Sequence, residues 1–318
     1  MFDMYNYARC FCAHDQNLNL TLLSVSEKAN LAMSHDDLVL DIQSLAQAGE
    51  LQPAAVAAAD LLQVPLPLSA EHERNIDIVA AELIDACLMP DAPAASKEVI
   101  AFFEGAIRCT ATAPGSAFSA DPVGKPNLHK SLAMLYALSG SYVKSQRHML
   151  RADAPAQFAH MLATWAGLVA PGEAELLLCR AALGMLCVTS SLLPSGGGSD
   201  VSGGTGSGSD ATSGVASVRA LLREASVLHR SGTSSIDPDS PLGHFVELLL
   251  IAVEKRAPPM IGWLVEQYGA WLKRDPALLK YATVIQQRTA ELVQSAMMPA
   301  AGEASELAGG ASTIEEND

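Results

Sequence analysis

The sequence predicts an all-α protein built as a solenoid of stacked helix pairs. Alanine and leucine dominate the 318 residues while aromatic residues make up 5%, a composition typical of packed helices rather than of sheets. Apolar residues recur at helical spacing along most of the chain. Gly and Pro turn signals separate these stretches, so one helix follows another with short connections.

Composition also disfavours several classes of function. The formal net charge of −15, from 35 acidic and 20 basic residues, repels phosphate backbones and anionic lipid surfaces. The longest apolar stretch, 174–188, is too short to span a bilayer and contains Glu175 and Arg180. Residues 1–14 lack the pattern of a signal peptide. We therefore expect a cytosolic protein that neither binds nucleic acid nor inserts directly into a membrane.

The first predicted helices form an antiparallel hairpin. Leu38, Ile42 and Leu45 share one helical face, and Gly49 supplies a C-terminal stop. A second helix runs from Pro53 to Leu62. Residues 1–36 show only weak periodicity and are predicted as a divergent N-terminal segment.

Two more helices follow the break at Pro65 and Pro67. The first ends before Pro90, and the second runs from Ser96 to Cys109. Their apolar stripes consist of Ile76, Val79, Ala80, Leu83 and Cys87, and of Val99, Phe102, Phe103 and Ile107.

The central helices follow a small, polar loop at residues 110–125. Pro126 occupies a favoured first helical position, and Leu128, Leu132, Leu135 and Leu138 follow before a turn at Gly140. The next predicted helices cover 142–150, 156–168 and 173–188. This succession of pairs is typical of a solenoid, and residues 37–189 are predicted as its N-terminal and central part.

A Gly/Ser tract interrupts the helical pattern at residues 190–214 and predicts a disordered insertion rather than a phosphate-binding loop. A C-terminal helical solenoid is predicted at 215–298, followed by a disordered acidic tail at 299–318. The helices expected in the C-terminal part cover 215–228, 241–253, 258–273 and 275–297.

Two stretches resemble the Golgi-to-ER traffic protein 4 family. The first contains a Gly-x-Pro-x-Leu-His start at Gly124–His129, a Tyr-x-x-small-x-x-His return at Tyr142–His148, and a later Leu186–Cys187 helix end. The second contains an apolar helix at 248–253, then Glu266-Gln267-Tyr268 and Lys273-Arg274-Asp275-Pro276. The likeness covers about residues 40–190 and 215–290.

The resemblance implies a right-handed α-solenoid of TPR-like antiparallel helix pairs that acts as an adaptor without enzymatic activity or cofactor. Its C-terminal helices would bind a ubiquitin-like-domain subunit, which recruits a client-loaded co-chaperone. Its N-terminal helices would bind a targeting ATPase for tail-anchored membrane proteins. Residues 1–36 do not resemble the family's first helical pair, so no ATPase-contact residue is carried over.

The expected partner-binding residues lie in the C-terminal helices, where apolar anchors recur at the spacing of a helix-in-groove interface. These residues are Phe245, Leu248, Leu249, Leu264, Tyr268 and Arg274. The alternative is that the apolar members are core residues. Similarly, Lys273–Pro276 has a local explanation, in which basic residues offset a helix C-terminus, Asp275 caps the next helix and Pro276 begins it.

For the other candidate residues, a structural role is favoured over metal binding or catalysis. His129 and His148 lack a further ligand at metal-binding spacing, and Cys10 and Cys12 lack a second Cys or His pair. No nucleophile elbow, zinc-protease helix or phosphate-loop motif is present in the sequence. The alternative function is a TPR-like scaffold subunit of another trafficking or proteasome-related complex.

Overall fold

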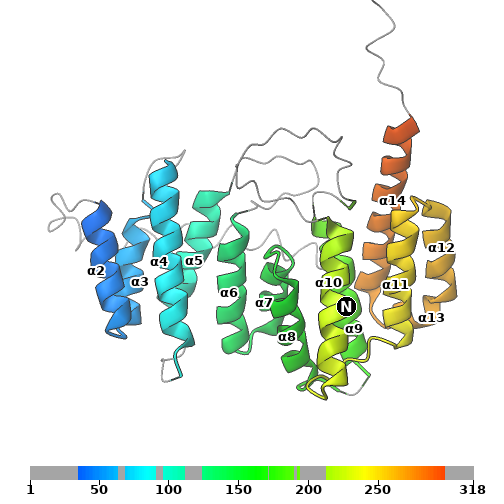
Figure 1. The fold of residues 1–318 in the computed structure, drawn as a ribbon, viewed down its shortest axis with the longest axis horizontal. Coiled ribbons are helices and arrows are strands. Elements are labelled where there is room, and N and C mark those ends of the chain that lie inside the picture. Colours follow the sequence, from blue (N-terminus) through cyan, green and yellow to red (C-terminus); the bar gives the residue numbers. More distant parts are fainter. Residues whose placement is uncertain are drawn as a thin grey trace, which may run out of the picture. The chain divides into compact units, whose positions relative to one another are not determined.

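The computed structural model describes residues 35–63, 69–90, 96–111, 124–170, 172–189, 192–193 and 213–297. Within these residues every regular element is an α-helix (Figure 1), which confirms the predicted all-α fold class. The chain divides into two compact units, residues 1–92 and 93–318. Most of 1–36, most of the Gly/Ser tract and all of 299–318 lie outside the described residues.

The first unit contains α2 (His35–Gln47), α3 (Leu51–Asp60) and α4 (Ala70–Leu88). Helix α2 packs against both α3 and α4, and Ile42 and Ile76 are fully buried between these helices. Gly49 has φ +79° where α2 ends, which is the conformation that favours glycine after a helix. The hairpin and its stop are therefore as predicted, although α3 begins at Leu51, with Pro53 in its first turn.

The second unit contains the remaining helices. They are α5 (Lys97–Thr110), α6 (Pro126–Leu138), α7 (Tyr142–Met149), α8 (Pro155–Ala166), α9 (Ala174–Val188), α10 (Gly214–Arg230), α11 (Pro241–Glu254), α12 (Pro258–Gln267), α13 (Gly269–Leu272) and α14 (Pro276–Met297).

Successive helices of this unit pack as antiparallel neighbours, α5 on α6, α6 on α7 and α11 on α12, and they stand side by side in Figure 1. Several start where the sequence indicates. The Ser240 hydroxyl accepts a hydrogen bond from the Gly243 amide at 3.2 Å and caps α11, while Pro126 begins α6.

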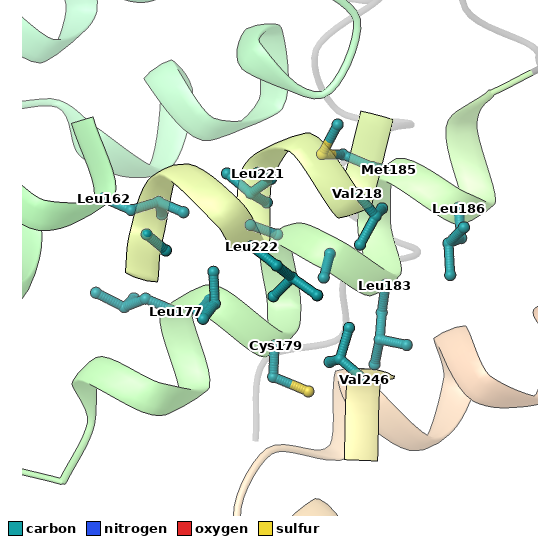
Figure 2. Close-up of a cluster of buried hydrophobic side chains, with 14 of the residues drawn as sticks. Leu162, Leu177, Cys179, Leu183, Met185, Leu186, Val218, Leu221, Leu222 and Val246 are labelled. Carbon is teal, nitrogen blue, oxygen red and sulfur yellow. The ribbon is translucent and has the colours of Figure 1, made fainter. Parts of the chain in front are cut away.

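Helix α9 is the centre of the second unit. It contacts α8, α10, α11 and α14, and side chains from α8 to α11 meet around it (Figure 2). A helix that is apolar on nearly all sides is buried, which explains the long apolar stretch in the sequence. Among the described helices, none combines the length and the apolar character needed to cross a bilayer.

The predicted single helix over 258–273 is wrong, because the structure breaks it into α12 and α13 at Tyr268. Tyr268 has φ −93° and ψ 10°, outside the α-helical range, and Gly269 follows it. Glycine is a weak helix former, so this is the point where the segment bends at the lowest cost. The break places the Tyr268 and Trp271 rings 5.9 Å apart between centroids.

Helix α14 closes the C-terminal end of α9 through one arginine. The Arg288 guanidinium donates hydrogen bonds to the carbonyl oxygens of Leu186 at 2.6 Å, Cys187 at 3.1 Å and Thr189 at 2.6 Å. These carbonyls belong to the last turn of α9 and to its C-cap residue, where intrahelical donors run out. Arg288 therefore satisfies the end of α9 immediately before the Gly/Ser tract.

Replacing Arg288 with methionine is expected to lower the free energy of unfolding by about 2–3 kcal/mol, because carbonyl groups lose a charged donor. Urea denaturation followed by circular dichroism measures the change. Arg288→Lys should recover only part of the loss, since an ammonium cannot reproduce the planar fork of donors. Equal stability of Arg288→Met and the wild type would contradict this role.

Candidate partner-binding surface

Three of the six predicted partner-binding residues lie inside the fold. Phe245, Leu249 and Leu264 are each 0% exposed, in the core between α11 and its neighbours. They shape the C-terminal helices but offer no atoms to a partner in this conformation. An acidic substitution at these positions would bury a carboxylate and test folding rather than binding.

Leu248 and Tyr268 are half-buried and pack against that core. The Tyr268 ring lies 5.5 Å from the ring of Phe245 and 5.9 Å from that of Trp271, measured between centroids. Tyr268 therefore connects a fully buried ring on α11 to an accessible ring on α13. Such a chain of aromatic contacts holds the outer ring in a defined position.

Arg274 is exposed, but its guanidinium is engaged within the chain. It donates to the Glu175 carboxylate and to the Gly172 carbonyl, next to the start of α9. Beside it, Arg180 pairs with Asp275 at 2.6 Å. Both ion pairs tie the start of α14 to α9, so Arg274 has a structural task.

Asp275 also accepts a hydrogen bond from the Ala277 amide at 3.0 Å, and Pro276 is the first residue of α14. The cap and the first-turn proline of the Lys273–Pro276 motif are therefore confirmed, whereas the offset of a helix C-terminus by its basic residues stays a prediction.

Two tryptophans that sequence reasoning missed are exposed on the last helices. Trp263 on α12 is 55% exposed and Trp271 on α13 is 38% exposed. Trp263 lies off the stripe formed by Ile261 and Leu264, and that departure from the apolar pattern is the signal that could have revealed it. We call Leu248, Trp263, Tyr268 and Trp271 the C-terminal surface.

The two histidines of the family-like motif meet between α6 and α7. Their Nδ1 atoms lie 3.0 Å apart, so one imidazole donates a hydrogen bond to the other. Burial, then the charge of His148, lowers the pKa of His129 to about 3. Burial, then the charges of Arg151, Arg147 and Lys144, lowers the pKa of His148 to about 4. Both rings are therefore neutral at pH 7.

Other polar and sulfur groups show no arrangement for metal chemistry in the part of the chain that the structure describes. No cluster of three or more His, Cys, Asp or Glu side chains there could hold a metal ion. Cys87, Cys109, Cys179 and Cys187 are free thiols, and burial raises the pKa of Cys179 above its ordinary value. Cys10 and Cys12 lie outside the described residues.

The fold and the C-terminal surface define a helical repeat scaffold that presents accessible aromatic side chains on its last helices. The family model of Golgi to ER traffic protein 4 matches residues 16–297 of this chain. The chain belongs to the Golgi to ER traffic protein 4 family. The match begins at residue 16, so likeness to the family extends N-terminal of residue 37.

Individual relatives agree with this family. A Golgi to ER traffic protein 4 homolog from Dictyostelium discoideum is 27% identical over 164 residues, 51% of this chain and 43% of that relative. The alignment therefore spans less than half of the relative's length. The crystal structure of Get4 from C. therm. is similar in fold, with a TM-score of 0.56, 18% identity, and coverage of 89% of this chain and 86% of that one.

Proposed function

We propose that this protein is a cytosolic adaptor, not an enzyme, that joins a ubiquitin-like-domain subunit to a targeting ATPase. The ubiquitin-like subunit brings a co-chaperone loaded with a tail-anchored membrane protein for delivery to the ER membrane. The observation that carries this proposal is the family match over residues 16–297. The match also favours this role over a scaffold of another trafficking or proteasome-related complex.

The adaptor acts by proximity. Holding the loaded co-chaperone and the ATPase on one chain raises the effective concentration of each for the other, and client transfer then approaches an intramolecular step. The N-terminal helices are proposed to contact the ATPase, and the C-terminal helices the ubiquitin-like subunit. No residue of the N-terminal unit is assigned to the ATPase contact.

Within the C-terminal helices, the C-terminal surface is the proposed site for the ubiquitin-like subunit. Tryptophan and tyrosine contribute disproportionately to binding energy because each buries a large rigid area on association. Trp263 and Trp271 have accessible area to lose, whereas Phe245, Leu249 and Leu264 have none. Phe245 supports this surface from below, because the Tyr268 ring packs against it.

Alanine substitution of the two tryptophans tests this site. The Trp263→Ala and Trp271→Ala variants of the chain are each expected to bind the purified ubiquitin-like subunit more weakly. The two losses of affinity multiplied together should reach at least about tenfold, as for interface hot spots. Isothermal titration calorimetry measures the affinity. Both positions are surface-exposed, so circular dichroism spectra and thermal midpoints should stay close to those of the wild type.

Leu168→Ala is the matched control, because Leu168 is an exposed apolar residue at the end of α8, 69% accessible and outside the C-terminal surface. Its affinity should equal that of the wild type. If the wild type binds the subunit and both tryptophan variants bind equally well, the site lies elsewhere. If the wild type does not bind the subunit at all, the adaptor proposal itself fails.

A further inference from the structure

In one stretch of this acidic protein, every charged side chain is basic. Residues 124–152, which contain α6 and α7, include no Asp or Glu, although the whole chain has a net charge of −15. The cations of this stretch are Lys125, Lys130, Lys144, Arg147 and Arg151. A local reversal of sign within an acidic chain creates a defined positive region for an anionic group.

Two of these cations lie on α7, and a third follows the helix. Lys144 and Arg147 are three positions apart, the spacing that places residues on the same helical face, and Arg151 lies in the turn after Met149. Lys144 and Arg147 are exposed, and Arg151 is partly exposed. We call these three residues the α7 basic face.

Contacts beneath this face support a concentration of positive charge. The Lys144 ammonium lies 5.1 Å from the centre of the Tyr136 ring, over its face. The ring of His148 stacks on Tyr136 at 5.7 Å between centroids. After burial, the charges of Arg151, Arg147 and Lys144 contribute to lowering the pKa of His148.

Two acidic groups border this face. Glu104 on α5 accepts a hydrogen bond from the Tyr136 hydroxyl at 2.7 Å. Asp153 follows the basic stretch in the sequence. In the described part of the chain, no salt bridge joins Lys144 or Arg147 to a carboxylate. These two cations therefore retain their capacity for an anionic partner.

The surroundings favour a short protein segment over nucleic acid or a membrane. Helix α7 has eight residues and is about 12 Å long, which matches two turns of a bound helix. A duplex or a lipid surface would extend past it onto the acidic remainder of the chain. Val143, 57% exposed beside Lys144, adds an apolar contact that suits a peptide mixing acidic and apolar residues.

We propose that the α7 basic face, with Val143, is a docking surface for an acidic segment of another protein. Carboxylates spaced by three or four residues would pair with Lys144 and Arg147, and an apolar residue between them would cover Val143. This surface is separate in sequence and in supporting helices from the C-terminal surface. It does not depend on the proposed partners of the adaptor.

The test uses a fluorescein-labelled helical peptide of about 12 residues that alternates paired glutamates with leucine, a length of about 18 Å. Fluorescence anisotropy measures its binding to the full-length chain. A Lys144→Gln, Arg147→Gln double variant is expected to bind at least about tenfold more weakly. Raising the salt from about 50 to about 300 mM should weaken wild-type binding several-fold.

The matched control is Arg223→Gln, Lys255→Gln, which removes two exposed positive charges from α10 and from the residue after α11. This control should bind the peptide as the wild type does, and thermal midpoints check that all variants fold. Equal weakening of both double variants overturns the proposal, because net charge alone would then explain binding.

Two further experiments test whether something other than an acidic segment of another protein occupies the α7 basic face. If the peptide binds a chain shortened to residue 297 but not the full chain, the chain's own acidic C-terminal residues occupy the face and the partner proposal fails. If phosphatidylserine vesicles bind in a Lys144- and Arg147-dependent way while the peptide does not, the surface recognises lipid and the proposal is likewise overturned.

Discussion

Gly243→Ala is expected to destabilise the protein by at least about 3 kcal/mol, the upper end of typical overpacking penalties. A Cβ atom at this position would lie 1.8 Å from the Pro238 carbonyl oxygen and 2.7 Å from its carbon. Both atoms belong to the backbone, so no side-chain rotation can make room. The turn before α11 would have to open and release the Ser240 cap on the Gly243 amide. Thermal and urea denaturation measure the loss.

Gly269→Ala is the matched control for this prediction. A Cβ atom at Gly269 would meet nothing within 4 Å, so the same chemical change should alter stability by no more than about 1 kcal/mol. A Gly243→Ala protein that unfolds at the wild-type temperature would show that the approach of Pro238 is not a constraint in solution.

The second prediction concerns the His129–His148 pair, which should make the fold sensitive to mild acid. An unfolded histidine takes up a proton near pH 6.5, whereas the folded pKa values are about 3 for His129 and about 4 for His148. Between these values the unfolded state binds more protons, so stability falls as pH decreases from about 6.5 to about 4. Each ring should lose about 3 kcal/mol over this pH range, so the loss from the pair should be on the order of 5–6 kcal/mol. Urea denaturation at several pH values measures it.

His148→Gln should reduce the stability lost between pH 6.5 and pH 4, because one buried imidazole no longer titrates. His244→Gln is the control, since the His244 side chain is exposed on α11, and its pH profile should match that of the wild type. Carboxylates contribute equally to the acid response of all three proteins. An identical pH profile for His148→Gln and the wild type would therefore contradict the histidine explanation.

Helix existence was largely predictable from the sequence, because local signals agree with the packed fold. Pro126 and Pro241 mark helix starts that the structure shares, and Gly49 marks a stop. The helix break at Tyr268 was not predicted, since the apolar repeat continues through it. Ring packing between Tyr268 and Trp271 accompanies the bend, and that contact depends on geometry rather than on residue spacing.

The candidate site was less predictable for a different reason. Apolar residues at helical spacing identify a face but not what covers it. Phe245 and Leu249 satisfied that pattern because they are core residues, while Trp263 and Trp271 fell outside it because they face solvent. Arg274 was predicted from the sequence to contact a partner. In the structure its guanidinium donates hydrogen bonds to Glu175 and Gly172, about a hundred positions away.

The sequence by itself determined most of the helices, their order and several of their ends, since propensity, capping and turn geometry act between residues a few positions apart. Only the tertiary structure decided that α9 is surrounded by α8, α10, α11 and α14, that Arg288 closes its end, and which aromatic rings remain accessible. Burial and ion pairing depend on which distant segments meet. Residue spacing within a single segment does not predict that arrangement.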